Sequence, residues 1–410
     1  MSSKEIRISQ PASTVTDDEP SVPRYDGPAF FSYGFRPFFL SAALFAGIAI
    51  PWWVLVFAFG GHAGFLYPAR DWHVHEMLFG FLSAIMTGFL LTAVPNWTGR
   101  SPVRGLELAG LWMLWLAGRL LIALPSPPLV AAVVDSAFLV TVAFILWREL
   151  AASNSWGQAP IGVLITAYAA ANIAFHVTAL RGTSAEVPER VALSLIMLLL
   201  TMIGGRVVPN FTREFLIQSR LTTLPPPLSK FDGLSIGLVA VAVVAWIVQP
   251  QHAVTGTALL TAGAINVVRL SRWRGWLTWR EPIIVILHVG YTWLVLALLA
   301  LGIAALDIGL SQANAVHLLT AGAVGAMTLG IMTRASLGHT GREKHADLAT
   351  VVMYVLVNIG ALLRMVVPHT ETPTTMTHLL LASSAAAWSG AYLVFALRYG
   401  SFLVRPNVDE

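Results

Sequence analysis

The sequence predicts an all-α polytopic membrane protein of about twelve transmembrane helices, arranged as a pseudo-threefold repeat of four helices each. Three observations support this prediction. First, 56% of the 410 residues are hydrophobic and 11% are charged, whereas a soluble domain carries about 25% charged residues. Second, the apolar residues gather in runs long enough to cross a bilayer, and third, the basic residues alternate between the loops that join them. A chain this apolar requires lipid around it.

Twelve apolar runs approach the length of about 20 residues that a membrane-crossing helix needs. They cover residues 38–59, 74–95, 106–124, 128–147, 159–180, 190–209, 233–249, 253–270, 282–304, 313–333, 347–367 and 376–398. We therefore divide the chain into a disordered cytoplasmic tail (1–30), a twelve-helix transmembrane domain (31–400) and a cytoplasmic C-terminal tail (401–410). The polar N-terminal tail lacks the basic and then apolar layout of a cleavable signal peptide.

The lysines and arginines predict the orientation of these helices. Of the 25 basic residues, 20 fall in the tails and the even-numbered loops, and only Arg70, Arg181 and Arg190 fall in odd-numbered loops. Cytoplasmic loops carry such an excess of basic residues, so both termini are predicted to lie in the cytoplasm of a bacterial inner membrane. Topology also explains the net charge of +4, so no nucleic-acid partner is expected.

An internal repeat relates the second, sixth and tenth predicted helices. Residues 75–100 align without a gap to residues 317–342, and the alignment matches small, polar and basic residues. The identical pairs are His75/His317, Gly80/Gly322, Ala84/Ala326, Gly88/Gly330, Ala93/Ala335, Thr98/Thr340, Gly99/Gly341 and Arg100/Arg342. A weaker third copy, residues 208–212, repeats residues 94–98 and aligns Glu189 with His75. Repeats of this kind are a common plan of membrane proteins.

Histidine is the leading metal ligand in this chain, because the sequence contains no cysteine. Histidines inside membrane spans are costly and mark functional sites. His75 and His317 are predicted at the same depth of two repeat-related helices, where they could be the axial ligands of one b-type haem. The alternative is a pair of hydrogen-bonded histidines at the membrane interface. Covalent haem attachment is excluded, because no Cys-x-x-Cys-His motif is present.

Other residues are candidates for a second site or for supporting roles. His73 and His176 could bind a second metal, and His288, which shares a helix face with Tyr291 and Thr292, could join a ligand cluster or a proton route. A hydrogen bond between helices is the alternative for His288. Arg70 and Arg181 lie in the predicted periplasmic loops, where they could pair with haem propionates or form ordinary surface charges. The buried charges Arg119 and Arg364 require partners that the sequence does not name.

Several motifs together resemble the NnrS family over nearly the whole chain after the tail. They are Arg36-Pro37-Phe38-Phe39, Trp72-His73-Val74-His75-Glu76-Met77, Val94-Pro95-Asn96-Trp97-Thr98-Gly99, Val208-Pro209-Asn210-Phe211-Thr212, the HVGYTW stretch that begins at His288, and Ala315-Val316-His317 with Thr340-Gly341-Arg342. The resemblance implies a bacterial membrane protein with haem and copper that takes part in nitric oxide metabolism and nitrosative stress.

The plan of twelve helices in three sets is also similar to that of the haem–copper oxidase catalytic subunit, which holds low-spin haem on its second and tenth helices. This likeness is one of architecture alone. Those oxidases place copper on histidines of the sixth and seventh helices, and here the corresponding runs contain no histidine. A copper site would need His73, His176, His288 or loop histidines, so the oxidase reaction does not follow from the plan.

Three functions fit these observations. The first is a haem protein that senses, binds or turns over nitric oxide or a related diatomic. Such a protein would receive its electrons from a donor in the membrane or the periplasm. A haem with two histidine ligands has no open position, so turnover would need a second centre. The second is a secondary transporter, because twelve helices with internal repeats also suit that class. The third is an assembly or structural factor without a cofactor.

Overall fold

The computed structural model describes residues 25–59, 66–367 and 374–408. The first 24 residues of the predicted tail, together with His62 and His369, lie outside the described residues. Within the described part, the chain forms helices joined by short loops and contains no β-strand. All twelve predicted spans are confirmed as helices long and apolar enough to cross a membrane. The protein is therefore a multi-pass membrane protein.

Nine of the spans are single α-helices, and three are α-helices interrupted by a π-helical stretch. The single helices are α1 (Phe35–Phe59), α4 (Leu106–Ala123), α5 (Pro128–Ala152), α6 (Ala159–Leu180), α9 (Lys230–Val248), α10 (Ala253–Ser271), α11 (Pro282–Ala305), α14 (Leu348–Met365) and α15 (Thr375–Val404). The interrupted spans are α2 (Ala69–His75), η2 (Glu76–Leu82) and α3 (Ser83–Thr98); α7 (Glu186–Leu199), η4 (Leu200–Gly204) and α8 (Gly205–Gln218); and α12 (Gln312–His317), η6 (Leu318–Val324) and α13 (Gly325–Gly338).

The three sets of four helices pack against one another in a closed order. The last helix of each set packs against the first helix of the next set: α5 against α6, α10 against α11, and α15 against α1. The second span of each set is 78%, 61% and 72% buried within the protein, whereas the third span of each set is 33% buried. The second, sixth and tenth spans, which the repeat relates to one another, therefore lie toward the inside of the bundle, and we call them the inner ring.

The π-helical stretches support the repeat in detail. His317 follows His75 by 242 residues, and the same shift carries η2 (Glu76–Leu82) onto η6 (Leu318–Val324) from first residue to last. The third stretch, η4 (Leu200–Gly204), begins at residue 200, whereas the shift of 114 residues predicts residue 190. A π-helical turn widens a helix locally and occurs often at functional sites. The inner ring is therefore irregular at a matching place in the first and third sets.

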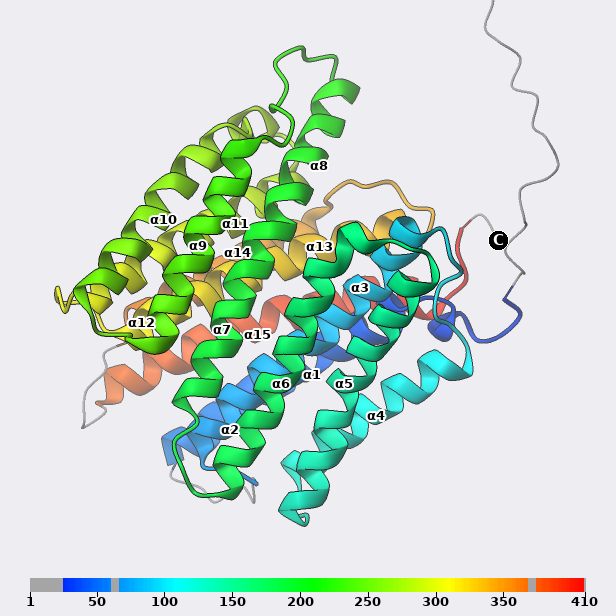
Figure 1. The fold of residues 1–410 in the computed structure, drawn as a ribbon. Helices are drawn as coiled ribbons and strands as arrows, with labels where there is room; N and C mark the ends of the chain where they lie inside the picture. Colours follow the sequence, from blue (N-terminus) through cyan, green and yellow to red (C-terminus); the bar gives the residue numbers. More distant parts are fainter. Residues whose placement is uncertain (1–24, 60–65, 368–373, 409–410) are drawn as a thin grey trace, which may run out of the picture.

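The two ends of the bundle can be told apart by the chain termini. The buried guanidinium of Arg36 donates hydrogen bonds to the carbonyl oxygen of Arg405, 2.6 Å away, and to the side-chain oxygen of Asn407, also 2.6 Å away. These contacts join the beginning of α1 to the end of α15 at what we call the terminal end. The opposite end, which we call the distal end, carries α2, α12 and the beginning of α7 (Figure 1).

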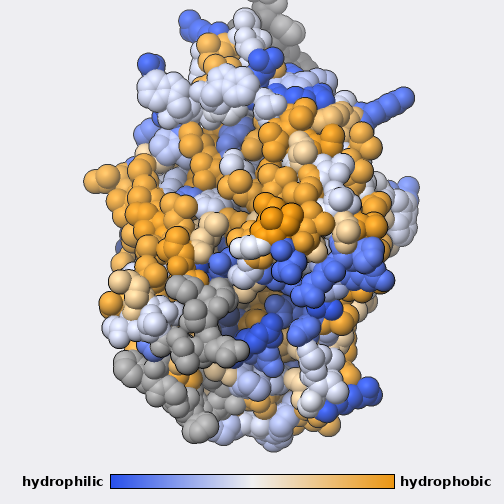
Figure 2. All heavy atoms as spheres, turned by 90° about the vertical axis from the view of Figure 1, so that its left-hand side faces the viewer, coloured by the Kyte–Doolittle hydropathy of each residue, from blue (hydrophilic) through white to orange (hydrophobic). Residues whose placement is uncertain are grey.

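Apolar side chains face outward over the outer helices. On α9, Val241, Val244 and Val248 are 64%, 57% and 70% exposed. Apolar residues cover much of the side seen in Figure 2, while hydrophilic residues gather at its upper end and below its middle. Such a surface is unfavourable in water and favourable in contact with lipid chains. The outer helices therefore present the surface that the bilayer covers.

An ion pair at the start of α14 gives a pH-dependent contribution to stability. Burial alone would raise the pKa of Asp347, but hydrogen bonds from Thr350 and the guanidinium of Arg398, 2.5 Å away, lower this pKa from 3.8 to about 2. A carboxyl group whose pKa falls on folding stabilises the protein above its unfolded pKa, and this stabilisation is lost as the pH falls through the folded pKa. We expect Asp347→Asn to lower the melting temperature at neutral pH, and the difference from wild type to shrink between pH 3.8 and about 2.

Asparagine also caps helices, so the substitution tests the charge rather than the cap. Asp307→Asn is the control, because Asp307 forms no ion pair within the described chain. A melting-temperature difference for Asp347→Asn that is the same at every pH would contradict the expectation.

Candidate functional site

Two groups of functional side chains lie at the distal end of the bundle. One group lines a cavity that opens among the inner helices, and we call it the distal cavity. The other is a fully buried cluster between the second, third, fourth and fifth spans. The two groups share no residue, because the second span turns its two neighbouring histidines to different sides.

The distal cavity has largely apolar walls and about 930 Å³ of space not filled by protein atoms, including the space at its mouth that is open to solvent. Helices from the first, second, sixth, tenth, eleventh and twelfth spans contribute to it. Its aromatic and sulfur-containing lining comprises Trp53, Met77, Phe81 and Trp388. Its polar and charged lining comprises His73, Glu189, His317, Thr320, Arg364 and Ser384. An apolar pocket with a few convergent polar groups is the usual form of a cofactor or ligand site.

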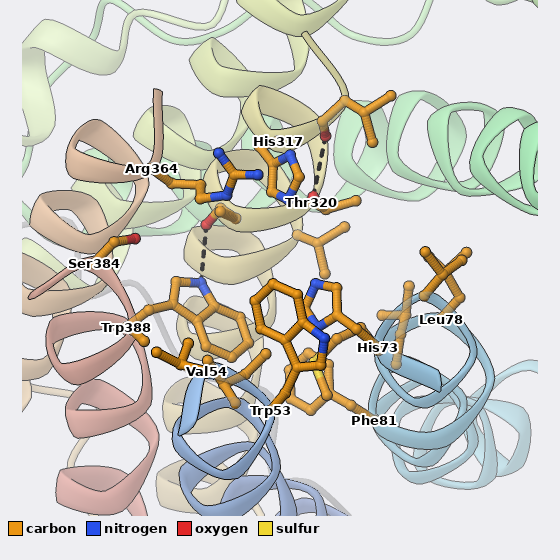
Figure 3. A pocket seen from close by; sticks show the side chains of 18 of the residues that line it. Trp53, Val54, His73, Leu78, Phe81, His317, Thr320, Arg364, Ser384 and Trp388 are labelled. Carbon is orange, nitrogen blue, oxygen red and sulfur yellow. Dashed lines mark hydrogen bonds between the residues drawn. The ribbon is translucent and has the colours of Figure 1, made fainter. Parts of the chain in front are cut away.

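His73 and His317 enter this cavity from different helices. The imidazole of His73 stacks on the indole of Trp53 with 4.2 Å between ring centroids, and its buried Nδ1 has no hydrogen-bond partner among the described residues. The Nδ1 of His317 lies 2.7 Å from the carbonyl oxygen of Ala313, so Nδ1 holds the proton and donates it there. This tautomer leaves the lone pair of His317 on Nε2. Figure 3 shows the two rings on different walls of the cavity.

Arg364 brings a positive charge into the same cavity (Figure 3). Its buried Nη1 donates to no described atom, and no described carboxylate forms an ion pair with it. An unpaired cation inside a membrane protein is costly and marks a place where an anionic group binds. Arg364 was noted in the sequence without a partner, and the structure places it beside the two histidines.

The buried cluster contains His75, Glu76, Arg119, Asp135 and His176. The three donor atoms of His75, Asp135 and His176 lie within 4.8 Å of one another, and all three residues are buried. The Nε2 atoms of His75 and His176 lie 3.3 and 2.8 Å from the same Asp135 oxygen. Two imidazoles and one carboxylate at this spacing could hold a transition-metal ion.

Charged and polar neighbours fix these three residues in place. Arg119 forms ion pairs with both Glu76, at 2.6 Å, and Asp135, so it lies between the two carboxylates. Glu76 also contacts His75 Nδ1 at 2.9 Å. Asn172 donates to Asp135 at 2.8 Å and accepts from His75 Nε2 at 3.0 Å. A Cβ atom at position 80 would collide with the Arg119 guanidinium, so Gly80 leaves the space that this guanidinium occupies.

Tyr67 completes the cluster from the loop before α2. Its hydroxyl lies 2.5 Å from His176 Nδ1. Burial raises the pKa of the Tyr67 phenol well above its usual value, with a further increase from Glu76 and a decrease from Arg119. Tyr67 therefore keeps its proton at neutral pH. A metal ion on Nε2 of His176 would leave the ring proton on Nδ1, and this proton would then be donated to the Tyr67 oxygen.

The residues predicted from the sequence occupy different surroundings. His75 and His317 do not share a cavity: His75 belongs to the buried cluster, and His317 lines the distal cavity with His73. The haem-ligand pair of His75 and His317 stays a prediction that no contact between them supports. His176 lies beside His75 in the buried cluster, whereas His73, the other histidine predicted for a second metal, lines the distal cavity.

The other predicted residues lie outside both groups. The Arg70 guanidinium pairs with Asp71 and Glu189, at 2.9 and 2.6 Å, and is 59% exposed. Arg181 lies exposed at the end of α6 and does not line the cavity. His288 forms an interhelical hydrogen bond of 2.8 Å with Thr212, which is the alternative that the sequence left open.

The sequence analysis did not identify Asp135 or Asn172 as site residues. Asp135 is the one acidic residue well inside the fourth apolar run, and Asn172 precedes His176 by one helical turn. Ionisable residues inside membrane spans are functional candidates by default. This rule singles out Asp135, but the sequence does not place it next to His75, because their helices meet only in the folded bundle.

Comparison with known proteins identifies one family. The model of the NnrS protein family matches residues 29–407, which covers the whole helical domain. No curated protein matches the chain. The match confirms the resemblance that the sequence motifs carry.

Proposed function

The chain belongs to the NnrS family, and from this premise we propose that it is a haem-binding inner-membrane protein of nitric oxide metabolism or nitrosative-stress defence. The observation that carries the proposal is the distal cavity, where histidines from two repeat-related helices meet apolar walls and Arg364, which forms no ion pair with any described residue. Family membership supports the connection with nitric oxide. The cavity supports the haem.

The residues that line the distal cavity fit a b-type haem. His73 and His317 are the residues that would hold the haem iron, because both are imidazoles on the cavity wall and His73 Nδ1 has no hydrogen-bond partner among the described residues. Arg364 is the proposed partner of a propionate, because arginine binds carboxylates through two parallel hydrogen bonds. Trp53, Phe81 and Trp388 supply the apolar contact that a porphyrin requires. These assignments replace His75 by His73 and Arg70 and Arg181 by Arg364.

A haem with two histidine ligands carries single electrons and has no open position for a diatomic. The protein's own contribution is to orient the ligands: Trp53 holds the His73 ring by stacking, and Ala313 sets the tautomer of His317. An electron donor in the membrane or periplasm would then supply electrons to the haem. Exchange of electrons with nitric oxide or another diatomic would take place at a second centre.

The buried cluster is the proposed second centre, and copper is the metal that family membership implies for it. Imidazole nitrogens and a carboxylate oxygen suit Cu²⁺. His75 and His176 would supply the nitrogens and Asp135 the oxygen. The cluster's dense ion pairing with Arg119 and Glu76 would hold the ligands in place before the metal arrives.

The proposed location is the bacterial inner membrane, with the terminal end in the cytoplasm. The excess of basic residues in the tails and even-numbered loops supports this orientation. The distal cavity and the buried cluster would then lie toward the periplasm.

The reduced-minus-oxidised optical spectrum of the purified protein tests the haem proposal. We expect wild type to show a low-spin b-type signal, and His73→Ala and His317→Ala to lose it, because each substitution removes one axial ligand. His75→Ala separates the two pairings: its spectrum should keep the low-spin signal. His378→Ala is the matched control, since His378 lies at the distal end but lines neither group.

Size-exclusion chromatography of each variant excludes loss of the fold as the cause. A signal lost in His75→Ala and kept in His73→Ala would restore the pairing of His75 with His317. Wild-type protein without any haem signal, after expression with sufficient haem, would overturn the proposal.

A further inference from the structure

Two more cavities lie among the second, sixth and tenth spans, next to the distal cavity. The first, which we call the central cavity, is lined by residues of these three spans together with Ile165 of α6. The second, which we call the terminal cavity, lies among the same three spans near the terminal end, with Phe39 of α1 and the loop after α13. All three cavities therefore border the second, sixth and tenth spans.

Neighbouring cavities share the side chains that separate them. Leu82 and Val324 line both the distal and the central cavity. Phe89 and Ile331 line both the central and the terminal cavity. Each boundary thus includes one pair of apolar residues that both cavities share.

The two boundaries obey the internal repeat. Val324 follows Leu82 by 242 residues, and Ile331 follows Phe89 by 242 residues, which is the shift between His75 and His317. Along each helix the boundaries are seven residues apart, or about 10 Å at 1.5 Å per residue. The central cavity therefore spans about one third of a hydrocarbon core that is about 30 Å thick.

The π-helical stretches border the central cavity on all three sides. Leu82 ends η2, Val324 ends η6, and Leu200, Ile203 and Gly204 belong to η4. A π-helical turn changes the direction of the following side chains relative to a regular helix. The irregular turns thus occur where the inner helices leave space between them.

The central cavity is apolar and its one polar side chain is satisfied. Thr328 hydrogen-bonds to the carbonyl oxygen of Val324 at 2.7 Å and to the hydroxyl of Tyr392 at 2.8 Å. Apolar cavities without free polar groups stay dry and bind apolar gases such as xenon. An ion or a polar solute would find no partner here, which argues against a transporter of such solutes. A small uncharged molecule needs no partner.

The outer two cavities differ from the central one in polarity. The terminal cavity contains Asn96, Arg334, His339 and Lys344, and the distal cavity contains the two histidines and Arg364. Water and charged groups can therefore occupy both ends, while the middle excludes them. This arrangement passes an apolar gas and blocks protons and ions.

We infer that the three cavities form a path along which a small, apolar diatomic of the nitric oxide class reaches the distal cavity from the terminal end. The inference rests on the proposed function for the identity of the gas, because the cavities select by size and polarity alone. Leu82 with Val324, and Phe89 with Ile331, are the two gates of this path. Thermal side-chain rotation would open them for a molecule of two atoms.

Xenon is the probe for this path, since it is apolar and needs no haem. Crystals of the protein pressurised with xenon should show a xenon atom in the central cavity. Val324→Phe should abolish this xenon site, because the added ring fills the boundary. Val241→Phe is the matched control, since Val241 faces outward on α9, and it should keep the wild-type xenon site. Ile331→Phe tests the second boundary in the same way if Val324→Phe does not fold.

A second measurement separates the path from the haem. In protein without haem, the exchange of dissolved xenon, followed by the relaxation of its nuclear spin, should be slower in Val324→Phe than in Val241→Phe. Absence of xenon from wild type, or occupation of the cavity by a detergent or lipid chain, would overturn the path. A haem spectrum that points to other ligands would leave the xenon result standing.

Discussion

Replacing Arg119 by methionine should destabilise the metal-free protein by about 3–5 kcal/mol, the cost of removing one partner from a buried ion pair. Arg119 is the cation that both Glu76 and Asp135 contact, and all three residues are buried. Without it, two carboxylates remain in a low-dielectric interior with no opposite charge from a lysine or arginine within the described contacts. Methionine preserves much of the side-chain volume, so the loss reflects charge more than packing.

Arg148→Met is the matched control on the neighbouring helix. Its guanidinium pairs with Glu107 and Glu149 but is 40% exposed, and partly exposed ion pairs contribute about 0–1 kcal/mol. Denaturant unfolding in detergent, after removal of metal with a chelator, measures both variants. A second variant, in which Glu76→Gln and Asp135→Asn accompany Arg119→Met, should recover part of the loss. Equal stabilities of Arg119→Met and Arg148→Met would contradict the buried-charge argument.

The fold could be predicted from the sequence because a membrane limits the backbone structures that a segment can adopt. Backbone polar groups must be satisfied within each segment in lipid, so an apolar run of sufficient length becomes a helix. The spacing of 242 residues between His75 and His317 predicted equivalent helices, and η2 and η6 follow the same spacing. Sequence could not reveal the π-helical turns, because the apolar residues that form them also suit a regular helix.

The site could be predicted from the sequence only in part, for a geometric reason. His73 and His75 are two residues apart, so on a helix they point about 200° away from each other at 100° per residue. One must face the inner ring and the other the outer helices, but local sequence does not say which. The decision depends on Asp135, Arg119 and Asn172, which come from other spans. The repeat favoured His75 as the partner of His317, because the two residues match in the alignment. In the structure, however, it is His73 that lines the same cavity as His317.

Metal analysis gives the sharpest test of the buried cluster. Wild-type protein incubated with Cu²⁺ and then desalted should retain about one copper ion per chain, as one set of three ligands allows. His176→Gln should retain none, because it removes a nitrogen ligand while glutamine preserves much of the side-chain volume. His288→Gln is the matched control: His288 is also a buried histidine, but it bonds to Thr212 and contributes to no described metal cluster.

Tyr67→Phe tests whether the cluster binds metal as a built site rather than by chance contact. The Tyr67 hydroxyl touches His176 Nδ1, the ring nitrogen opposite the proposed ligand atom Nε2. Substitution of such an outer partner lowers metal affinity by about 10–100-fold. Competition with a chelator of known affinity should therefore show weaker copper binding in Tyr67→Phe than in wild type. Unchanged affinity, or full copper retention by His176→Gln, would mean that the cluster is an ion-pair network that stabilises the distal end without a metal.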